Sequence, residues 1–225
     1  MTHPAVSPQD EERLLKGTTT IGLVCKDGVV LASERRATAG TMIANKQTTK
    51  VFKVDANLGV TIAGMVGDAQ VLARYLKAEV ALYRLRRNGP VSAEGAATLL
   101  ANILNGSRFY PYYAWLILGG VDGKGGHVFS VDPAGGCIED RYCSIGSGST
   151  FAYGLLEEGY SRDLATADGV DLALRGLTVA MRRDSASGDG YIVHVITPKD
   201  YRELSDDEIN KRLKALKIPI PPVPA

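Results

Sequence analysis

Histidine is scarce in this chain: only three of its 225 residues are histidines. His3 lies in a polar N-terminal stretch, whereas His127 and His194 lie inside apolar, strand-like segments, where a histidine is more often structural than catalytic. A Ser-His-Asp triad is therefore poorly supported as the basis of any activity. No spacing of His, Cys, Asp and Glu matches a zinc site either, so we expect no metal and no cofactor.

The chain also has few cysteines, a net charge close to zero and no long apolar segment. The three cysteines, Cys25, Cys137 and Cys143, form no CxxC pair, and an odd, scattered set favours a reducing compartment over a disulfide framework. No segment resembles a secretory signal or is apolar for long enough to span a membrane. The net charge of +1 offers no attraction to nucleic acid or an anionic membrane. These features predict a cytoplasmic protein without nucleic-acid or membrane partners.

The apolar pattern alternates between strand and helix periods along the chain. Strand-like segments bounded by turn residues are 18–25, 28–33, 50–54, 58–64, 114–121, 127–131, 141–145 and 190–197. Helical periodicity covers 68–87, 92–105, 150–159 and 166–182, and a capping box at 205–208 opens a last short helix. Paired strands and grouped helices predict a single α+β domain in which helix layers cover antiparallel sheets.

The helix expected over 68–87 carries apolar residues at helical spacing. Its inward face is predicted to consist of Val71, Tyr75, Ala78, Leu82 and Leu85. The three arginines near its end suit the negative end of the helix dipole, so they do not indicate a nucleic-acid site.

Three threonines follow Gly17 and raise a question about the start of the domain. Threonine is β-branched and favours strands, which is sufficient to explain the run. Alternatively, cleavage after Gly17 frees Thr18 with a hydroxyl and an α-amine on one residue. A hydroxyl needs a neighbouring base to act as a nucleophile. A free α-amine, with a pKa of about 7.7 to 8, is such a base near neutral pH and makes a histidine unnecessary.

A site of this kind needs a cation, a carboxylate that holds the cation, and an N–H donor for an oxyanion. Lys50 is a candidate cation, Glu34 a candidate carboxylate and Gly64 a candidate donor. Taken singly these residues are weak indications, because charged residues at strand ends are usually solvated and a turn alone explains Gly64.

Several motifs together resemble those of proteasome β subunits, closest to the archaeal type. They are GTTTIGLVCKDGVVLASERRATAG, Lys50, TIAGMVGDAQ, ATLLANILN, GSGS at 146–149 and RRDSASGDG at 182–190. The resemblance implies an N-terminal nucleophile hydrolase, a four-layer αββα sandwich of two antiparallel sheets between helix layers. It also implies a propeptide, 1–17, that is removed on maturation and a hydrolase domain, 18–217. The last residues, 218–225, read as a proline-rich tail.

The resemblance assigns roles to particular positions. Thr18 matches the nucleophile and Gly17 the residue before the self-cleaved bond, while Lys50 and Gly64 match the family's lysine and oxyanion donor. Three residues match groups that orient the new N-terminus: Ser147, Asp184 and Ser187. By the family's layout, the pocket for the residue before the cut is lined by Ala37, Thr48, Phe52, Ile62 and Val66. Glu34 departs from the pattern, since the family usually has Asp there. Because the glutamate side chain is longer, its carboxylate must retract or the strand must shift for the two groups to meet at Lys50.

The resemblance also implies partners. These are identical or related β subunits in a seven-membered ring, an α-subunit ring, a regulatory ATPase unfoldase that acts through the α ring, and unfolded protein substrates. Two alternatives remain at this level. One is a proteolytically inactive, unprocessed structural subunit of a mixed β ring, and the other is the simpler bacterial two-ring threonine protease of the same fold. The RDSASGDG and ATLLANILN segments favour the proteasome over the second alternative.

Overall fold

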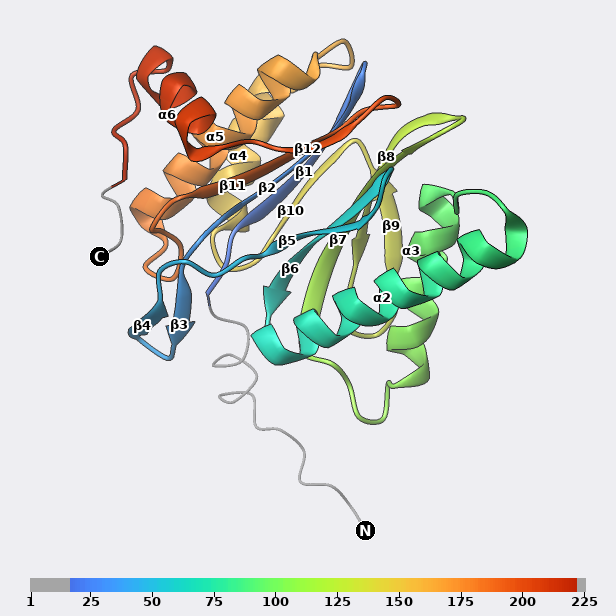
Figure 1. Cartoon of the computed structure of the whole chain (residues 1–225). Helices are drawn as coiled ribbons and strands as arrows, with labels where there is room; N and C mark the ends of the chain where they lie inside the picture. Colours follow the sequence, from blue (N-terminus) through green and yellow to red (C-terminus); the bar gives the residue numbers. More distant parts are fainter. Residues whose placement is uncertain (1–16, 222–225) are drawn as a thin grey trace.

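The computed structural model describes residues 17–221 and contains two five-stranded antiparallel sheets (Figure 1). The first has the strand order β10–β1–β2–β11–β12 (Tyr142–Ile145, Thr20–Cys25, Gly28–Glu34, Tyr191–Ile196, Tyr201–Glu203). The second has the order β5–β6–β7–β8–β9 (Val51–Asp55, Leu58–Gly64, Ala114–Asp122, Gly125–Val131, Cys137–Asp140). A separate hairpin joins β3, Ala37–Ala39, to β4, Met42–Asn45.

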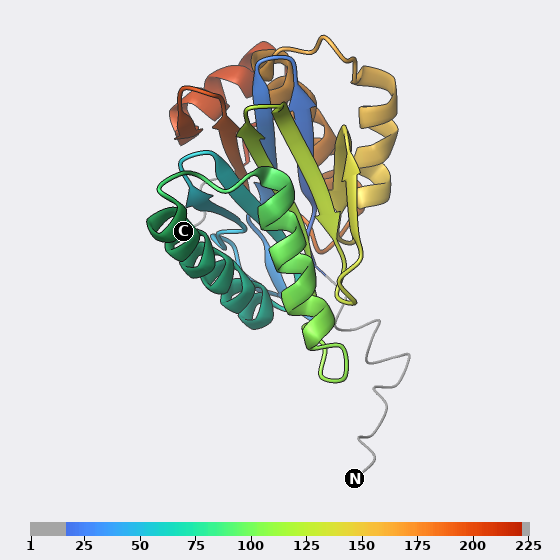
Figure 2. The same ribbon diagram turned by 90° about the vertical axis from the view of Figure 1, so that its right-hand side faces the viewer.

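Helices cover the outer face of each sheet (Figures 1 and 2). The second sheet packs against α2, Val66–Arg87, and α3, Ala93–Gly106. The first packs against α4, Ser149–Gly159, α5, Thr166–Arg183, and α6, Asp206–Ala215. A third apolar cluster fills the space between the sheets. The three clusters define four layers in the order helix, sheet, sheet, helix, which confirms the predicted α+β sandwich.

Strand β2 shows how the sequence builds this arrangement. Its seven residues are all buried, and alternate side chains point to opposite faces of the sheet. Val30 and Ala32 contact the helix layer, whereas Val29 and Leu31 contact the facing sheet. A strand buried on both faces is therefore apolar along almost its whole length, and it ends at a charged residue, Glu34, next to the site described below.

The predicted inward face of α2 is wrong. The buried residues of this helix are Ala69, Leu72, Ala73, Leu76 and Val80. From the predicted set, Val71 is half-buried and the others are exposed, with 51% exposure for Tyr75 and 80% for Leu85. Apolar residues lie on two faces of this helix. The buried face includes Ala69 and Ala73, whose small side chains allow the helix to pack closely on the sheet. All residues from 81 to 87 are exposed, so apolar periodicity near the end of the helix carried no information about burial.

Three short elements were not predicted: the β3–β4 hairpin, β9 and β12. Each strand has only three or four residues, and most of the residues of the four strands together are exposed. The alternation of apolar and polar residues that predicts a strand is therefore absent. The first strand also begins two residues later than predicted, at Thr20, which leaves Thr18 and Thr19 outside the sheet.

The two terminal segments are only partly described. Residues 1–16 of the expected propeptide and 222–225 of the expected tail lie outside the described residues. Among residues 17–221, no helix is both long enough and apolar enough to cross a membrane.

Candidate active site

Thr18 lies at the end of the first sheet, just before β1. The position follows from the pairing of Thr20 with Ser33 of β2 and Ile145 of β10. The Thr18 residue is 5% exposed. Gly146, with a φ of +99°, passes so close that an added Cβ would lie 2.0 Å from the Thr18 carbonyl oxygen. A glycine is therefore required at position 146 to hold the segment that carries Thr18.

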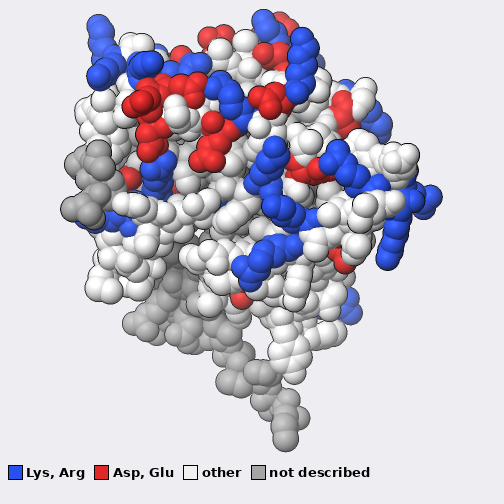
Figure 3. Space-filling view, in the orientation of Figure 1, with Lys and Arg blue, Asp and Glu red and all other residues white. Residues whose placement is uncertain are grey.

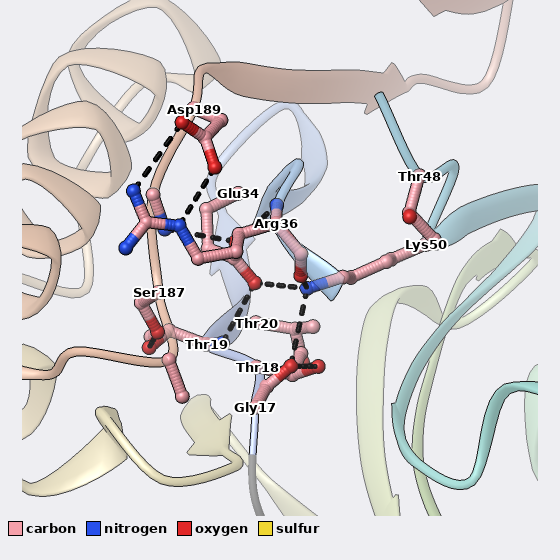
Figure 4. A network of polar contacts seen from close by, with 12 residues as sticks. Gly17, Thr18, Thr19, Thr20, Glu34, Arg36, Thr48, Lys50, Ser187 and Asp189 are labelled. Atoms are coloured by element: carbon pink, nitrogen blue, oxygen red, sulfur yellow. Dashed lines mark hydrogen bonds and ion pairs between the residues drawn. The ribbon is translucent and has the colours of Figure 1, made fainter. Parts of the chain in front are cut away.

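Glu34, the last residue of β2, is fully buried beneath this segment. Its carboxylate forms an ion pair with the ammonium of Lys50, as Figure 4 shows. It also accepts three backbone N–H groups, from Thr19 at 3.2 Å, Arg36 at 2.6 Å and Gly188 at 3.0 Å. Burial raises the pKa of Glu34, and Lys50 and the N–H donors of Gly188 and Arg36 oppose that rise. Every contact needed to hold a buried carboxylate is present.

Lys50 precedes β5 and comes from the opposite sheet. Its side chain is 3% exposed, and its Nζ donates to Glu34, to the Arg36 carbonyl oxygen and, at 3.4 Å, to the Gly17 carbonyl oxygen. Burial lowers the pKa of Lys50, and the carboxylate of Glu34 opposes this effect. The ammonium is thus held by one carboxylate and aimed at the peptide bond between Gly17 and Thr18 (Figure 4).

The Thr18 hydroxyl lies on the same peptide group. Its Oγ1 donates to the Gly17 carbonyl oxygen, which also receives the hydrogen bond from Lys50. A hydroxyl, the carbonyl of the preceding residue and a buried cation therefore meet at one point. A cation beside a hydroxyl favours its deprotonated form and makes the oxygen a better nucleophile.

A second polar cluster surrounds the backbone of Thr18 and Thr19. Asp184 Oδ2 accepts hydrogen bonds from Ser147 and Ser187, both at 2.6 Å. Ser147 Oγ lies 3.4 Å from the Thr18 nitrogen, and Ser187 Oγ lies 2.7 Å from Thr19 Oγ1. The three residues that the resemblance assigned to a new N-terminus are brought together beside Thr18 and Thr19, although position 187 is 40 residues beyond Ser147.

Sequence reasoning missed Arg36 and Asp189. The Arg36 guanidinium binds Asp189 through Nε at 2.7 Å and Nη2 at 3.3 Å, and donates to the Ser185 carbonyl at 2.9 Å. The hydrogen bond to Asp189 raises the pKa of Arg36. This clamp ties the end of β2 to the loop that holds Asp184. The sequence offered one indication of this pair: an arginine stands two residues after Glu34, and the Gly/Ser-rich segment 182–190 contains an acidic residue that could pair with it.

Gly64 is the last residue of β6 and has a φ of +101°. An added Cβ would lie 2.4 Å from the Tyr113 carbonyl oxygen, so only glycine fits without strain. The residue pairs with Ala114 of β7 and forms no hydrogen bond with Thr18 in this structure. Its role as oxyanion donor stays a prediction.

The five predicted pocket residues differ in exposure. Ile62 is 3% exposed and packs beneath α2, whereas Val66 is 40% exposed. Ala37, Thr48 and Phe52 are half-buried. The pocket assignment stays a prediction.

Burial and hydrogen bonding describe the settings of Cys25, His194 and His127. Burial raises the pKa of Cys25 to about 12, so its thiol is protonated at neutral pH. Burial lowers the pKa of His194 to about 4, and its Nδ1 lies 2.7 Å from the Tyr201 hydroxyl. His127 lies between the carboxylates of Glu139 and Asp122, at 2.6 and 3.2 Å. These contacts agree with the expected structural role of the two histidines.

Comparison with known proteins identifies the family of this chain. A family described as "Proteasome subunit" matches residues 14–196. The "Proteasome subunit beta" of Methanothermobacter thermautotrophicus is 51% identical over 92% of this chain and 99% of the relative. That of Thermoplasma acidophilum is 50% identical over 91% of this chain and 97% of the relative, and that of Ferroglobus placidus is 48% identical over 92% and 99%. The chain therefore belongs to the proteasome subunit family, as a β subunit of the archaeal type.

Proposed function

We propose that this chain is the catalytic β subunit of a 20S proteasome and a threonine endopeptidase. Membership of the family makes it a subunit of the proteasome core and a peptidase of the proteasome type. The observation that carries the finer proposal is the buried ammonium of Lys50, which Glu34 holds against the Thr18 segment. A buried, paired lysine that donates to the Gly17 carbonyl oxygen is costly to maintain and has a direct chemical use beside Thr18.

Maturation is proposed to begin at the Gly17–Thr18 bond. Thr18 Oγ attacks the Gly17 carbonyl carbon, the carbon–nitrogen bond breaks as the Thr18 nitrogen takes the hydroxyl proton, and an ester forms. Water then hydrolyses this ester and releases residues 1–17. The contact between the Thr18 hydroxyl and the Gly17 carbonyl supports this step, because it holds both reacting groups together before cleavage.

The mature site then acts on substrates with the same hydroxyl. The free Thr18 amine, through a water molecule, takes the hydroxyl proton as Oγ attacks a peptide carbonyl, and later delivers it to the leaving amine. Lys50 favours the neutral amine and the ionised hydroxyl. The Gly64 N–H is proposed to hold the oxyanion, and Ser147, Asp184 and Ser187 to orient the N-terminus. Water completes the reaction by hydrolysing the acyl ester.

Glu34 is proposed to perform the function of the aspartate usual in this family. The structure supports this substitution, because the longer carboxylate reaches Lys50 while accepting N–H groups from Thr19, Arg36 and Gly188. The whole assembly is proposed to comprise seven-membered β rings, α rings and a regulatory ATPase, in the cytoplasm, acting on unfolded proteins.

The N-terminal residue of the assembled chain tests this proposal. Chains co-expressed with α subunits should begin at Thr18, and intact mass measurement should show the loss of residues 1–17. A particle that retains the full chain and hydrolyses no peptide would instead identify an unprocessed, structural β subunit.

Peptide preference provides a separate prediction. The predicted pocket has small or apolar walls and no acidic floor, so assembled particles should cleave after Leu or Tyr at least about tenfold faster than after Arg. Fluorogenic peptides that differ only in the residue before the cut measure this ratio, and particles carrying Thr18→Ala give the background. Faster cleavage after Arg would contradict the pocket assignment.

A further inference from the structure

Arg36 joins the Glu34–Lys50 pair to the 184–190 loop. Its backbone N–H donates to Glu34 Oε2 at 2.6 Å, and its carbonyl oxygen accepts a hydrogen bond from Lys50 Nζ. Its guanidinium turns away from the pair and forms an ion pair with Asp189 of the loop (Figure 4). The backbone of this one residue is therefore bound to the charged pair, while its side chain is bound to the loop.

The guanidinium of Arg36 spans the loop. Nη1 donates to the Ser185 carbonyl oxygen at 2.9 Å, and Nε and Nη2 donate to the two carboxylate oxygens of Asp189 at 2.7 and 3.3 Å. Gly188 lies directly against it, since an added Cβ there would be 2.4 Å from Nη2. Asp189 has a φ of +65°, a conformation that few residues other than glycine adopt. The guanidinium thus holds both sides of a turn that is unfavourable by itself.

Partial burial and geometry distinguish this clamp from the surface ion pairs of the chain. Basic and acidic side chains lie side by side over the upper part of the face in Figure 3, and exposed pairs contribute little to stability. Arg35 forms a pair of this kind with Asp206, whose side chain is 66% exposed. The side chains of Arg36 and Asp189 are only 20% and 15% exposed. A bidentate, charge-assisted contact that is mostly buried fixes direction as well as distance.

The position of the loop bears on the direction of the Glu34 carboxylate. Oε1 of Glu34 binds Lys50, whereas Oε2 accepts the N–H groups of Arg36 and, at 3.0 Å, of Gly188. One of these two donors belongs to Arg36 itself and the other to the loop that its guanidinium holds. The clamp therefore fixes both donors relative to each other. Because the carboxylate is planar, fixing Oε2 also fixes where Oε1 meets the lysine.

We propose that Arg36 is a positioning residue for the chemistry of Thr18. Its guanidinium holds the loop in the place where the Gly188 N–H orients the carboxylate of Glu34 toward Lys50, and where the serine and aspartate groups of the same loop lie beside the Thr18 segment. Arg36 acts through these groups and not on the reacting atoms. The inference rests on the catalytic role proposed above and adds a residue to it.

Three variants disrupt the clamp in different ways. Arg36→Ala removes the guanidinium. Asp189→Asn removes the charge that it binds, but retains the shape of the side chain and tolerates the positive φ. Gly188→Ala displaces the guanidinium with a methyl group and retains the N–H that binds Glu34. Arg35→Ala is the matched control, because it removes the neighbouring exposed ion pair and leaves the clamp intact.

Kinetics of assembled particles test the positioning role. Each variant is co-expressed with α subunits, intact mass over time gives the rate of processing, and a fluorogenic peptide gives kcat and KM per processed chain. Arg36→Ala and Asp189→Asn should lower the processing rate and kcat by about 10- to 100-fold with KM little changed, because a displacement of about 1 Å has an effect of this size. Arg36→Lys retains the charge and should have an intermediate rate, whereas Arg35→Ala should stay within about twofold of the parent.

A double variant and hydrogen exchange separate the clamp from other effects. Gly188→Ala should lower kcat in the parent but have little further effect in Arg36→Ala, which has no guanidinium to displace. Amide hydrogen exchange in the 184–190 loop should be about tenfold faster or more in Arg36→Ala than in the parent. This last measurement does not depend on cleavage.

Several outcomes would overturn the proposal. Full kcat in Arg36→Ala shows that the guanidinium does not position the site, and equal losses in Arg36→Ala and Arg35→Ala assign the effect to the loss of any ion pair at the end of β2. A rise in KM alone makes Arg36 a substrate-binding residue. Unchanged hydrogen exchange in the loop excludes the clamp as its support, even in particles that cleave peptides. A parent particle that is unprocessed and inert contradicts the proposed function and the catalytic part of this inference, whereas hydrogen exchange still decides whether Arg36 holds the loop.

Discussion

The Thr18→Ala variant is expected to assemble with α subunits, to retain residues 1–17 and to hydrolyse no peptide. Alanine removes the oxygen that forms the ester in both the proposed maturation and the proposed substrate reaction. Loss of a covalent nucleophile typically lowers turnover by about 10⁴-fold or more. Intact mass gives the processing result, and hydrolysis of a fluorogenic peptide by the same particles gives the activity.

Thr18→Ser is the matched control for this experiment. Serine retains the hydroxyl and, after cleavage, the amine, so this variant should be processed and should hydrolyse peptides at a measurable rate. Thr19→Ala tests whether damage to the neighbouring hydrogen bonds is sufficient, because it removes the hydroxyl that contacts Ser187 but leaves the nucleophile. If Thr18→Ala were trimmed at Gly17 in the absence of another protease, self-processing would be excluded.

The second large effect is expected at the Glu34–Lys50 pair. Glu34→Ala leaves a buried cation without its carboxylate, and such a change destabilises a protein by about 3–5 kcal/mol. The side chain of Lys50 then has no anion to direct it toward Thr18. We expect processing and peptide hydrolysis to fall by about 100- to 1,000-fold in Glu34→Ala and in Lys50→Ala.

The double variant distinguishes a functional pair from two independent contributions. If Glu34 acts only by holding Lys50, the double variant should be little less active than either single variant. Independent roles would instead multiply the two losses. Activity must be expressed per assembled particle, because a destabilised chain also assembles less.

Glu34→Asp is the sharper variant. Aspartate retains the charge and shortens the arm by one methylene, so measurable processing and hydrolysis are expected. Glu34→Gln retains the shape and removes the charge, and it should resemble Glu34→Ala in activity. Full activity in Glu34→Ala would remove Glu34 from the mechanism, and equal loss in Glu34→Asp and Glu34→Gln would show that the length of the side chain matters as much as its charge.

The sequence alone determined the order of the longer strands and helices and the α+β class, and it suggested the chemistry to test. Long apolar segments with a clear period specified most elements, and the scarcity of histidine directed attention to Thr18. The motifs then named Glu34, Lys50, Ser147, Asp184 and Ser187 as one group, and the structure places them around Thr18. Local pattern is sufficient for such elements, because each period reflects which side chains are buried.

Only the tertiary structure decided which face of α2 is buried, where the short edge strands lie and how Glu34 is accommodated. The Glu34 carboxylate is held by Lys50, 16 residues away, and by the Gly188 N–H, 154 residues away. The clamp between Arg36 and Asp189 spans 153 residues. These contacts exist because the two sheets stack face to face. Stacking brings the end of β2, the residue before β5 and the 184–190 loop together. No local period along the sequence encodes which distant segments are brought together by packing.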